Sequence, residues 1–251
     1  MAKSTDHIGS LAKGLKVLEA FGADTPRMTI TDASAATGLD RATARRCLLT
    51  LHHEGYLDYD GKFFTITHRA LRLGMGALAA LPLPQIVQPW LDQLAEQIGQ
   101  SCSVAILDGT EIVYLARAAQ RRVMSIGLMP GSRLPAHCTS FGRVLLASLP
   151  TEQAAEIIRA SDLTPRTAAS LTTPEAILDQ LATIREKGFA VIDQEIEVGL
   201  RSIAVPLRNS RGQTVAALNT GMAATHVSVA AMVDEYLPHL TRVQTGLMRV
   251  L

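Results

Sequence analysis

Residues 29–67, TITDASAATGLDRATARRCLLTLHHEGYLDYDGKFFTIT, decide the fold of the N-terminal part of the chain. Thr29 is predicted to begin a short helix. Gly38 ends that helix, because glycine readily takes the left-handed conformation of a helix C-cap. Asp40 then begins a second helix over residues 41–53, since an aspartate side chain can accept hydrogen bonds from the free N–H groups of a first turn. Two helices joined by a tight glycine turn are therefore expected.

A hairpin is predicted directly after these two helices. Residues 56–59 and 63–67 form alternating, strand-like runs, and the Asp60-Gly61 pair between them is a strong signal for a tight turn. A further helix with one apolar face is predicted over residues 11–21, before the two helices that the glycine turn joins. Two helices joined by a glycine turn and followed by a hairpin are the order of a winged helix-turn-helix.

The helix over residues 41–53 is the predicted DNA-reading helix. Its apolar stripe faces the core, and the opposite side carries the residues expected to contact DNA, Arg41, Thr43, Arg45, Arg46 and Thr50. Arginine can bind guanine through two parallel hydrogen bonds, and threonine can contact phosphate or the thymine methyl group. Lys62 in the hairpin, with Arg69 after it, is expected to reach backbone phosphates. The alternative is a helical bundle in which these arginines are a solvated face.

The composition is that of a folded globular protein. Hydrophobic residues make up 47% of the chain and charged residues 19%, and the net charge of +1 gives no overall basic field. Cys47, Cys102 and Cys138 are odd in number and widely spaced, which predicts free thiols in a reducing compartment and no metal site. Neither an N-terminal apolar segment nor a membrane-length apolar stretch is present, so a soluble, cytoplasmic protein is expected.

The chain is predicted to divide into three parts. Residues 1–67 are the winged helix-turn-helix, residues 68–83 a linker helix, and residues 84–251 a second domain that begins where Pro82 and Pro84 interrupt the pattern. Strands of the second domain are expected at 102–107, 112–117, 123–128, 189–192, 202–207 and 214–220. Its helices are expected at 84–98, 139–148, 152–160, 174–187 and 228–250, with a loop at 130–135. This mixture predicts an α+β fold.

The sequence resembles the IclR family of bacterial regulators over nearly its whole length. The resemblance is carried by SLAKGLKVLEAF at 10–21, ITDASAATGLDRATARRCLLTLHHEGYL at 30–57, LPAHCTSFGRVLLA at 134–147, GFAVIDQEIEVGLRSIAVPL at 188–207 and AALNTG at 216–221. Residues 133–150 and 197–209 are most similar to the branch that controls aromatic-acid catabolism, which includes protocatechuate, β-ketoadipate and 4-hydroxybenzoate regulators.

The resemblance implies a transcriptional regulator with a GAF-like α/β effector domain after the linker helix. Such a protein binds double-stranded operator DNA as a homodimer or a dimer of dimers, and Thr43 and Arg46 stand at the positions that family members present to DNA. The implied effector is a small carboxylic acid, here an aromatic acid or a ring-cleavage product that controls a catabolic operon. The alternative effector is a short keto-acid such as glyoxylate or pyruvate.

The segment Arg133-Leu-Pro-Ala-His-Cys-Thr-Ser140, which includes Cys138, is the predicted effector site. Thr139 or Ser140 lies at a helix N-terminus, where free N–H groups and the helix dipole favour an anion. Arg133 and His137 are expected to add charge-assisted hydrogen bonds to a carboxylate. The alternative is that Thr139 only caps the helix and Arg133 lies in solvent.

Further effector contacts are implied by the resemblance. Ser202 stands where many family members have cysteine, and Asn219 stands where others have serine. Gly221 replaces another family hydroxyl group, and Ile192 replaces an aspartate, which favours a bulkier and more apolar ligand than glyoxylate. An apolar wall is predicted from strand positions that are more often ordinary core, namely Met124, Ile126 and Met129.

Two other classes of function are the alternatives to a regulator. His137 and Cys138, with Ser140 close by, are the only candidate catalytic group, but neighbours in sequence rarely have the geometry of a nucleophile and its base. The acidic run of Asp193, Glu195 and Glu197 is interpreted as a solvated edge or loop. No phosphate-binding, zinc-protease or dinucleotide motif is present, so neither an enzyme nor a cofactor is expected. The second alternative is a winged helix that binds a protein partner.

Overall fold

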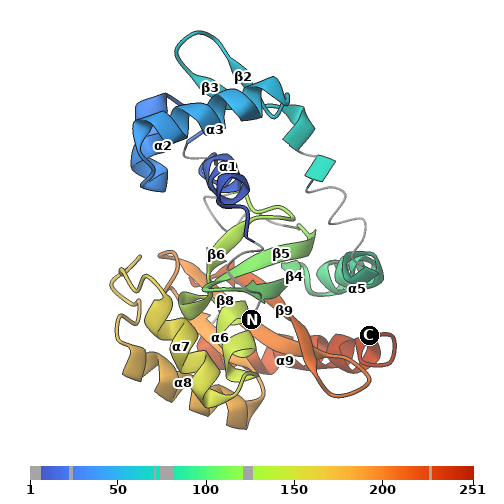
Figure 1. Cartoon of the computed structure of the whole chain (residues 1–251). Helices are drawn as coiled ribbons and strands as arrows, with labels where there is room; N and C mark the ends of the chain where they lie inside the picture. The colour runs from blue at the N-terminus through green and yellow to red at the C-terminus, as the bar shows by residue number, and fades with distance from the viewer. Residues whose placement is uncertain (1–6, 23–24, 71, 74–81, 121–126, 226–227) are drawn as a thin grey trace. The chain divides into compact units, whose positions relative to one another are not determined.

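The computed structural model describes residues 7–22, 25–70, 72–73, 82–120, 127–225 and 228–251. Contacts within the chain group it into two compact units, residues 1–80 and 81–251 (Figure 1). Of the predicted linker helix, residues 68–70 and 72–73 are helical, and residues 74–81 lie outside the described residues. The three-part division at residues 67 and 83 therefore stays a prediction.

The N-terminal unit has the predicted winged helix-turn-helix. It contains α1 (Gly9–Glu19), β1 (Arg27–Met28), α2 (Ile30–Thr37), α3 (Arg41–His53), β2 (Leu57–Tyr59) and β3 (Phe64–Ile66). The three strands form an antiparallel sheet in the order β1-β3-β2. The apolar sides of the helices and sheet meet in one core, composed of Val17, Met28, Ala33, Ala44, Leu48, Leu57 and Phe64.

Local hydrogen bonds account for the boundaries of these elements. The Thr29 side chain accepts a hydrogen bond from the Asp32 N–H, and the Asp32 carboxylate accepts one from the Thr29 N–H, which is a capping box. Gly38 ends α2 with a φ of 68°, and the Asp40 side chain caps α3 by accepting from the Thr43 N–H. In the hairpin, Asp60 accepts from two backbone N–H groups of the turn.

The C-terminal unit is built on a six-stranded antiparallel sheet in the order β6-β5-β4-β9-β8-β7. The strands are β4 (Ser101–Asp108), β5 (Glu111–Ala118), β6 (Arg133–Pro135), β7 (Ala190–Asp193), β8 (Leu200–Arg208) and β9 (Thr214–Ala223). The helices are α5 (Pro82–Ile98), η2 (Ala136–Cys138), α6 (Ser140–Ala147), α7 (Thr151–Ala160), α8 (Pro174–Lys187) and α9 (Val229–Leu247). The predicted α+β fold class is confirmed.

Helices cover both faces of this sheet (Figure 1). α5 and α9 pack on one face, against side chains such as Val104 of β4 and Leu218 of β9. α6, α7 and α8 pack on the other face, which presents small residues such as Ala105 and Ala217. Successive strand residues point to opposite faces, so neighbouring residues of one strand serve two separate cores.

Three predictions for this unit differ from the structure. The expected loop at 130–135 contains β6, an edge strand in which Pro135 can be the last residue. The helix expected from residue 84 begins two residues earlier, because α5 starts at Pro82 and a first helical turn has no need of the N–H groups that proline lacks. Residues 121–126 of the expected strand at 123–128 lie outside the described residues, and residues 127–128 are not in a strand.

Candidate effector cavity and DNA-binding surface

The exposed side of α3 carries three arginines, Arg41, Arg45 and Arg46. Within the described part of the chain, none of them is paired with a carboxylate. Thr50 is exposed as well and donates its hydroxyl to the Arg46 carbonyl oxygen, which is an ordinary bond within a helix. The arginines can therefore approach phosphates or base edges without losing an ion pair.

Thr43 is less exposed than these residues, and its contact with DNA stays a prediction. Its residue is only 8% exposed and faces a groove between α3 and α1, lined also by Leu15 and Leu18. Arg46 and Thr50 line the same groove, and Thr50 follows Thr43 by about two helical turns, so the two threonines point in nearly the same direction. A direct contact of this side chain with DNA therefore needs the flank of α3 toward α1 to approach the duplex.

The hairpin carries a second basic group. Lys62 Nζ lies 5.0 Å from the centre of the Phe63 ring, and the Arg27 guanidinium lies 4.5 Å from the same ring. Arg27 was not predicted from sequence, since it precedes the helices and reaches the hairpin only through the pairing of β1 with β3. Arg69 stacks on Tyr56 at 5.1 Å.

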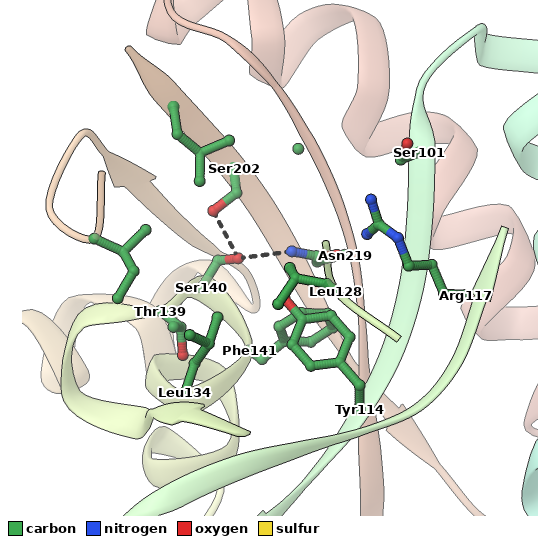
Figure 2. Close-up of a pocket in the computed structure, with 13 residues that line it drawn as sticks. Ser101, Tyr114, Arg117, Leu128, Leu134, Thr139, Ser140, Phe141, Ser202 and Asn219 are labelled. Carbon is green, nitrogen blue, oxygen red and sulfur yellow. Dashed lines mark hydrogen bonds between the residues drawn. The ribbon is translucent and has the colours of Figure 1, made fainter. Parts of the chain in front are cut away.

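A cavity lies in the C-terminal unit where the N-terminus of α6 meets the sheet (Figure 2). We call it the α6 cavity. It is lined by Ser101, Tyr114, Arg117, Leu128, Leu134, Thr139, Ser140, Phe141, Ile196, Leu200, Ser202, Asn219 and Gly221. The space between these side chains, including the open mouth, is about 530 Å³, and the free volume inside is about 40 Å³. The cavity is narrow, so a ligand larger than a few waters must move its walls apart.

Hydrogen bonds join the two sides of the cavity. The Ser140 hydroxyl of α6 receives one from the Ser202 hydroxyl of β8 at 2.9 Å and one from the Asn219 amide of β9 at 3.4 Å (Figure 2). Thr139 caps α6 by accepting from the Gly142 N–H at 3.1 Å. In the described residues, the N–H groups of Ser140 and Phe141 have no acceptor, so the positive end of α6 faces the cavity.

A bulge in the sheet decides which side chains of β5 reach the cavity. The register between β4 and β5 shifts between Val104 and Ala105, so that Arg117 is opposite Ser103 and Tyr114 is opposite Ala105. The extra residue of the bulge is Leu115, which has no partner in β4. In a regular strand, residues three positions apart, such as 114 and 117, point to opposite faces. The bulge therefore places the charge of Arg117 and the ring of Tyr114 on the same face of the sheet.

The approach of η2 to α6 requires glycine at position 142. A Cβ atom there would lie 2.0 Å from the Ala136 carbonyl oxygen, well inside any real contact distance. The short 3-10 helix η2 can therefore pack directly on the first turn of α6. This contact fixes the backbone that leads into Thr139 and Ser140.

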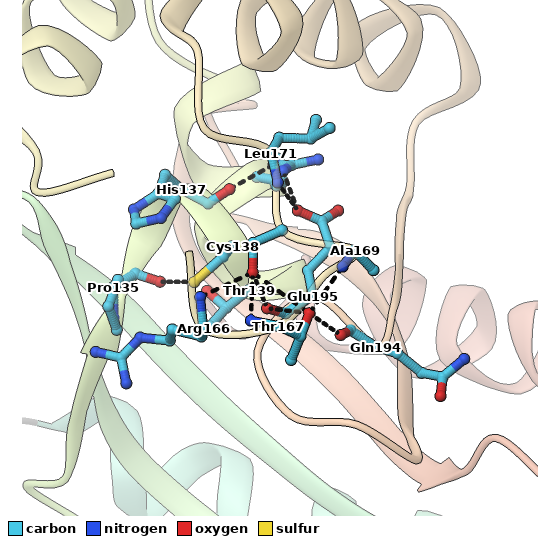
Figure 3. Close-up of polar contacts among 12 residues, drawn as sticks. Pro135, His137, Cys138, Thr139, Arg166, Thr167, Ala169, Leu171, Gln194 and Glu195 are labelled. Atoms are coloured by element: carbon cyan, nitrogen blue, oxygen red, sulfur yellow. Dashed lines mark hydrogen bonds and ion pairs between the residues drawn. The ribbon is translucent and has the colours of Figure 1, made fainter. Parts of the chain in front are cut away.

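A buried ion pair holds the loop between β7 and β8 against α6 (Figure 3). Arg143 Nη2 lies 2.7 Å from Glu195 Oε2, and Arg143 Nε donates to the His137 carbonyl oxygen at 2.6 Å. The expectation that Glu195 belongs to a solvated edge or loop was wrong, because its side chain is only 11% exposed and is paired with Arg143. The hydroxyl groups of Thr167 and Ser170 also donate to its backbone carbonyl oxygen. Burial raises the pKa of Glu195, and the charge of Arg143 opposes that shift.

Four of the predicted effector residues line the α6 cavity, namely Thr139, Ser140, Ser202 and Asn219. Gly221 also lines it, whereas Ile192 is buried elsewhere in the sheet. Their role in binding an effector stays a prediction, since no ligand contact is described for any of them.

The structure places the other predicted effector residues outside the α6 cavity. Arg133 is exposed on the edge strand β6, where it pairs with Asp108 at 2.8 Å and Glu111 at 2.7 Å. His137 and Cys138 are buried in η2 beside α6 and do not line the cavity. Met129 is 64% exposed, and Met124 and Ile126 lie outside the described residues.

Sequence reasoning missed Arg117, Tyr114 and Ser101 as lining residues. The available signal was a charged residue, Arg117, at the end of the otherwise apolar run of β5. Its partners come from distant parts of the chain, so the run alone could not show which face it occupies.

The candidate catalytic pair does not have the geometry of one. Burial raises the pKa of the Cys138 thiol to about 11, so the thiol is protonated at neutral pH. The Cys138 thiol faces the Pro135 carbonyl oxygen, and neither ring nitrogen of His137 has a hydrogen-bond partner among the described residues. Within this part of the chain, no base therefore activates the cysteine.

The fold and the cavity together define a class, a DNA-binding regulator with a separate small-molecule domain. The family pattern "IclR helix-turn-helix domain" matches residues 10–61, and "Bacterial transcriptional regulator IclR C-terminal" matches residues 75–244. The chain belongs to the IclR family of bacterial transcriptional regulators. It is therefore a regulator and not an enzyme.

Relatives of known function include two regulators of aromatic metabolism. The chain is 39% identical over 236 residues to the Pca regulon regulatory protein of Pseudomonas putida. The aligned region covers 94% of this chain and 81% of that protein. It is also 39% identical over 243 residues to the p-hydroxybenzoate hydroxylase transcriptional activator of Acinetobacter baylyi, covering 95% and 90%.

Solved structures agree with this membership. A transcriptional regulator from Rhodococcus sp. RHA1 is 40% identical, with a TM-score of 0.77 and coverage of 96% of this chain and 97% of that one. Another solved structure is the inducer-binding domain of PobR from Acinetobacter, a double mutant in complex with 3-hydroxybenzoic acid. It is 34% identical with a TM-score of 0.63, and the match covers 67% of this chain and 98% of that one. None of the described helices combines the length and the hydropathy of a membrane-spanning segment.

Proposed function

We propose that this chain binds operator DNA as a homodimer or a dimer of dimers, and that an aromatic acid or a ring-cleavage product in the α6 cavity controls the binding. The regulated genes are those of a catabolic operon for such acids. The observation that carries the proposal is the meeting of the α6 N-terminus, the Ser140–Ser202–Asn219 hydrogen bonds and an aromatic wall at one cavity.

The aromatic wall supports a ring-shaped ligand over a short keto-acid. Tyr114 and Phe141 lie edge to face with their ring centres 5.3 Å apart, and Leu128 and Leu134 extend the apolar lining. Apolar walls with a few placed polar groups are typical of small-molecule sites. The names of the relatives, a p-hydroxybenzoate hydroxylase activator and a domain solved with 3-hydroxybenzoic acid, support the same class.

On the DNA side, we assign the base contacts to Arg41, Arg45 and Arg46, with Thr50 beside them. Lys62 is assigned a phosphate contact. The dimer contact is assigned to the exposed apolar side of α1, where Leu11 is 59% and Leu15 is 47% exposed. An exposed apolar surface of this kind marks an interaction site.

We attribute control by the effector to thermodynamic linkage between effector binding and DNA binding. A ligand changes DNA affinity only through its different affinity for two arrangements of the protein. We assign the transmission of this change to the segment 68–83, which joins the two units along the chain.

The proposal is tested by titrating the full chain with acids while measuring thermal unfolding and operator binding. The panel is benzoate, 4-hydroxybenzoate, 3,4-dihydroxybenzoate, β-ketoadipate, glyoxylate and pyruvate. We expect a stability increase of RT ln(1 + [L]/Kd) with an aromatic or ring-cleavage acid, together with a change in operator affinity. A response to glyoxylate or pyruvate alone would favour the keto-acid alternative. A salt-independent affinity for DNA would contradict operator binding, since phosphate contacts release counterions.

A further inference from the structure

Phe63 is an aromatic side chain that lies outside the core of the N-terminal unit. It directly precedes β3, and successive residues of an extended chain point to opposite faces. Phe64 is fully buried in the core and stacks on Tyr59, so Phe63 faces away from that core. The ring is nevertheless half-buried, and cationic side chains pack against it.

Two cations from different parts of the chain meet on this ring. The Arg27 guanidinium carbon lies 4.5 Å from the ring centre, and Lys62 Nζ lies 5.0 Å from the same point. Both distances are within the range of about 6 Å in which the face of an aromatic ring attracts a cation. Both side chains are also exposed, so two positive charges are close neighbours on one surface of the hairpin.

The acidic residues of the hairpin leave these charges available. The Asp60 carboxylate accepts hydrogen bonds from the backbone N–H groups of Lys62 and Phe63, so it is committed to the turn. Asp58 lies in the same row of the sheet as Arg27, but β3 separates their two strands. In the described ranges of the chain, neither Arg27 nor Lys62 forms an ion pair. The two cations repel each other, and an anion bound to both would offset that repulsion.

The contact with the ring leaves the hydrogen-bond donors of Arg27 free. A guanidinium packed over a ring face uses its charge and its flat surface, while its N–H groups lie in its own plane. Among the described residues, no acceptor binds the N–H groups of this side chain. Phe63 thus fixes the position of a charge whose donors remain available for a bidentate bond to a phosphate.

The hairpin and α3 are parts of one folded unit. Their common core includes Leu57 and Phe64 of the strands and Ala44 and Leu48 of the helix. The cations on Phe63 therefore keep a fixed place relative to the arginines of α3 and can engage the same duplex. DNA carries one negative charge per roughly 1.7 Å of helix axis, so each of two neighbouring cations can meet a phosphate.

We propose that Arg27 and Lys62 form a phosphate-binding site for the DNA backbone, and that Phe63 is the positioning residue that holds both cations. This inference rests on the proposed function, to which it adds Arg27 and Phe63 as residues of the DNA interface. Phosphate contacts fix the register of a protein on the duplex and carry no sequence information directly. The site therefore acts on every DNA sequence alike.

Fluorescence anisotropy of the full chain at several salt concentrations tests this site with two probes. One is the duplex that the unmodified chain selects from a random-sequence pool, and the other is a scrambled duplex of the same length. In Arg27→Gln we expect binding to both duplexes to weaken by a similar factor, roughly threefold to tenfold, and the slope of log K against log [salt] to fall by about one. Arg27→Gln combined with Lys62→Gln should lower the slope by about two. Phe63→Leu keeps both charges, so we expect weaker binding with most of the slope retained.

Arg211→Gln is the matched control, because it removes one exposed arginine from the C-terminal unit. It should leave affinity and slope unchanged. Unmodified affinity and slope in Arg27→Gln, with normal thermal unfolding, would overturn the site. An equal loss in Arg211→Gln would overturn it too, because the effect would then be general electrostatics. A loss confined to the selected duplex would reveal a base contact and contradict the assignment to phosphate.

Competition with inorganic phosphate separates the DNA backbone from a free anion as the ligand. At equal ionic strength, phosphate should displace the duplex no better than chloride does. Stronger displacement by phosphate, lost in Arg27→Gln, would assign the site to a free phosphate and overturn the backbone contact. If the unmodified chain shows no salt-dependent binding to either duplex, the proposed function fails together with this inference. Salt-dependent binding that Arg27→Gln leaves unchanged removes this inference alone.

Discussion

Arg143 of α6 and Glu195 of the loop between β7 and β8 form an ion pair of 2.7 Å, in which the arginine side chain is only 1% exposed. The pair ties the first turn of α6 to the loop that carries Ile196 into the wall of the α6 cavity. Two charges this deeply buried have lost most of their hydration, so each depends on the other. The contact therefore positions the cavity and does not bind the ligand.

Removing only one partner of this ion pair should strongly destabilise the folded protein. Arg143→Met leaves the Glu195 charge buried without its partner, and we expect the free energy of unfolding to fall by about 3–5 kcal/mol. Urea unfolding measures the change. The double variant Arg143→Met with Glu195→Gln should be less destabilised than Arg143→Met, because no charge is left unpaired. Equal losses in the single and double variants would contradict a mutual dependence.

Gly142 is expected to tolerate no side chain. Gly142→Ala would place a Cβ 2.0 Å from the Ala136 carbonyl oxygen, so η2 must move off α6. We expect a loss of about 1–3 kcal/mol in unfolding free energy, together with weaker effector binding. Gly14→Ala in α1 is the matched control, since a Cβ at that position would meet nothing within 4 Å and alanine favours a helix. A similar loss in both variants would show that steric contact is not the cause.

Stability should depend on pH through His137. Burial lowers the pKa of His137 below its ordinary value of 6.5, and the charges of Arg143 and Arg166 act in the same direction. The unfolded chain therefore takes up a proton before the folded one does, and stability falls as the pH decreases through 6.5 toward the lowered pKa. The thermal midpoint of the unmodified chain should drop more steeply between about pH 7 and pH 5 than that of His137→Gln. Parallel pH profiles would rule out this histidine as the cause.

Measurements of DNA binding should distinguish a base contact by Arg45 of α3 from a phosphate contact by Lys62 of the hairpin. Arg45→Ala removes an exposed, unpaired guanidinium and is expected to weaken specific binding by about 1–3 kcal/mol. Lys62→Ala should weaken binding to all sequences and reduce the salt dependence by about one ion. Fluorescence anisotropy at several salt concentrations measures both effects. Arg208→Ala, an exposed arginine of the C-terminal unit, is the control and should leave both values unchanged.

The sequence by itself determined the winged helix-turn-helix. Its signals are local, because Thr29, Gly38 and Asp40 act on backbone groups within three or four residues, and the Asp60 carboxylate binds the N–H groups of its own turn. The same local logic located the start of α6, where Thr139 caps the helix and Ser140 faces the cavity.

Only the tertiary structure decided which charges reach the cavity. Arg133 and Arg117 are both strand arginines, but pairing of β6 at the sheet edge puts Arg133 in solvent with Asp108 and Glu111. The bulge between β4 and β5 turns Arg117 inward, and Glu195 is drawn into the interior by Arg143, 52 residues away. Strand register and buried pairing join residues far apart in the chain, so no short stretch of sequence contains them.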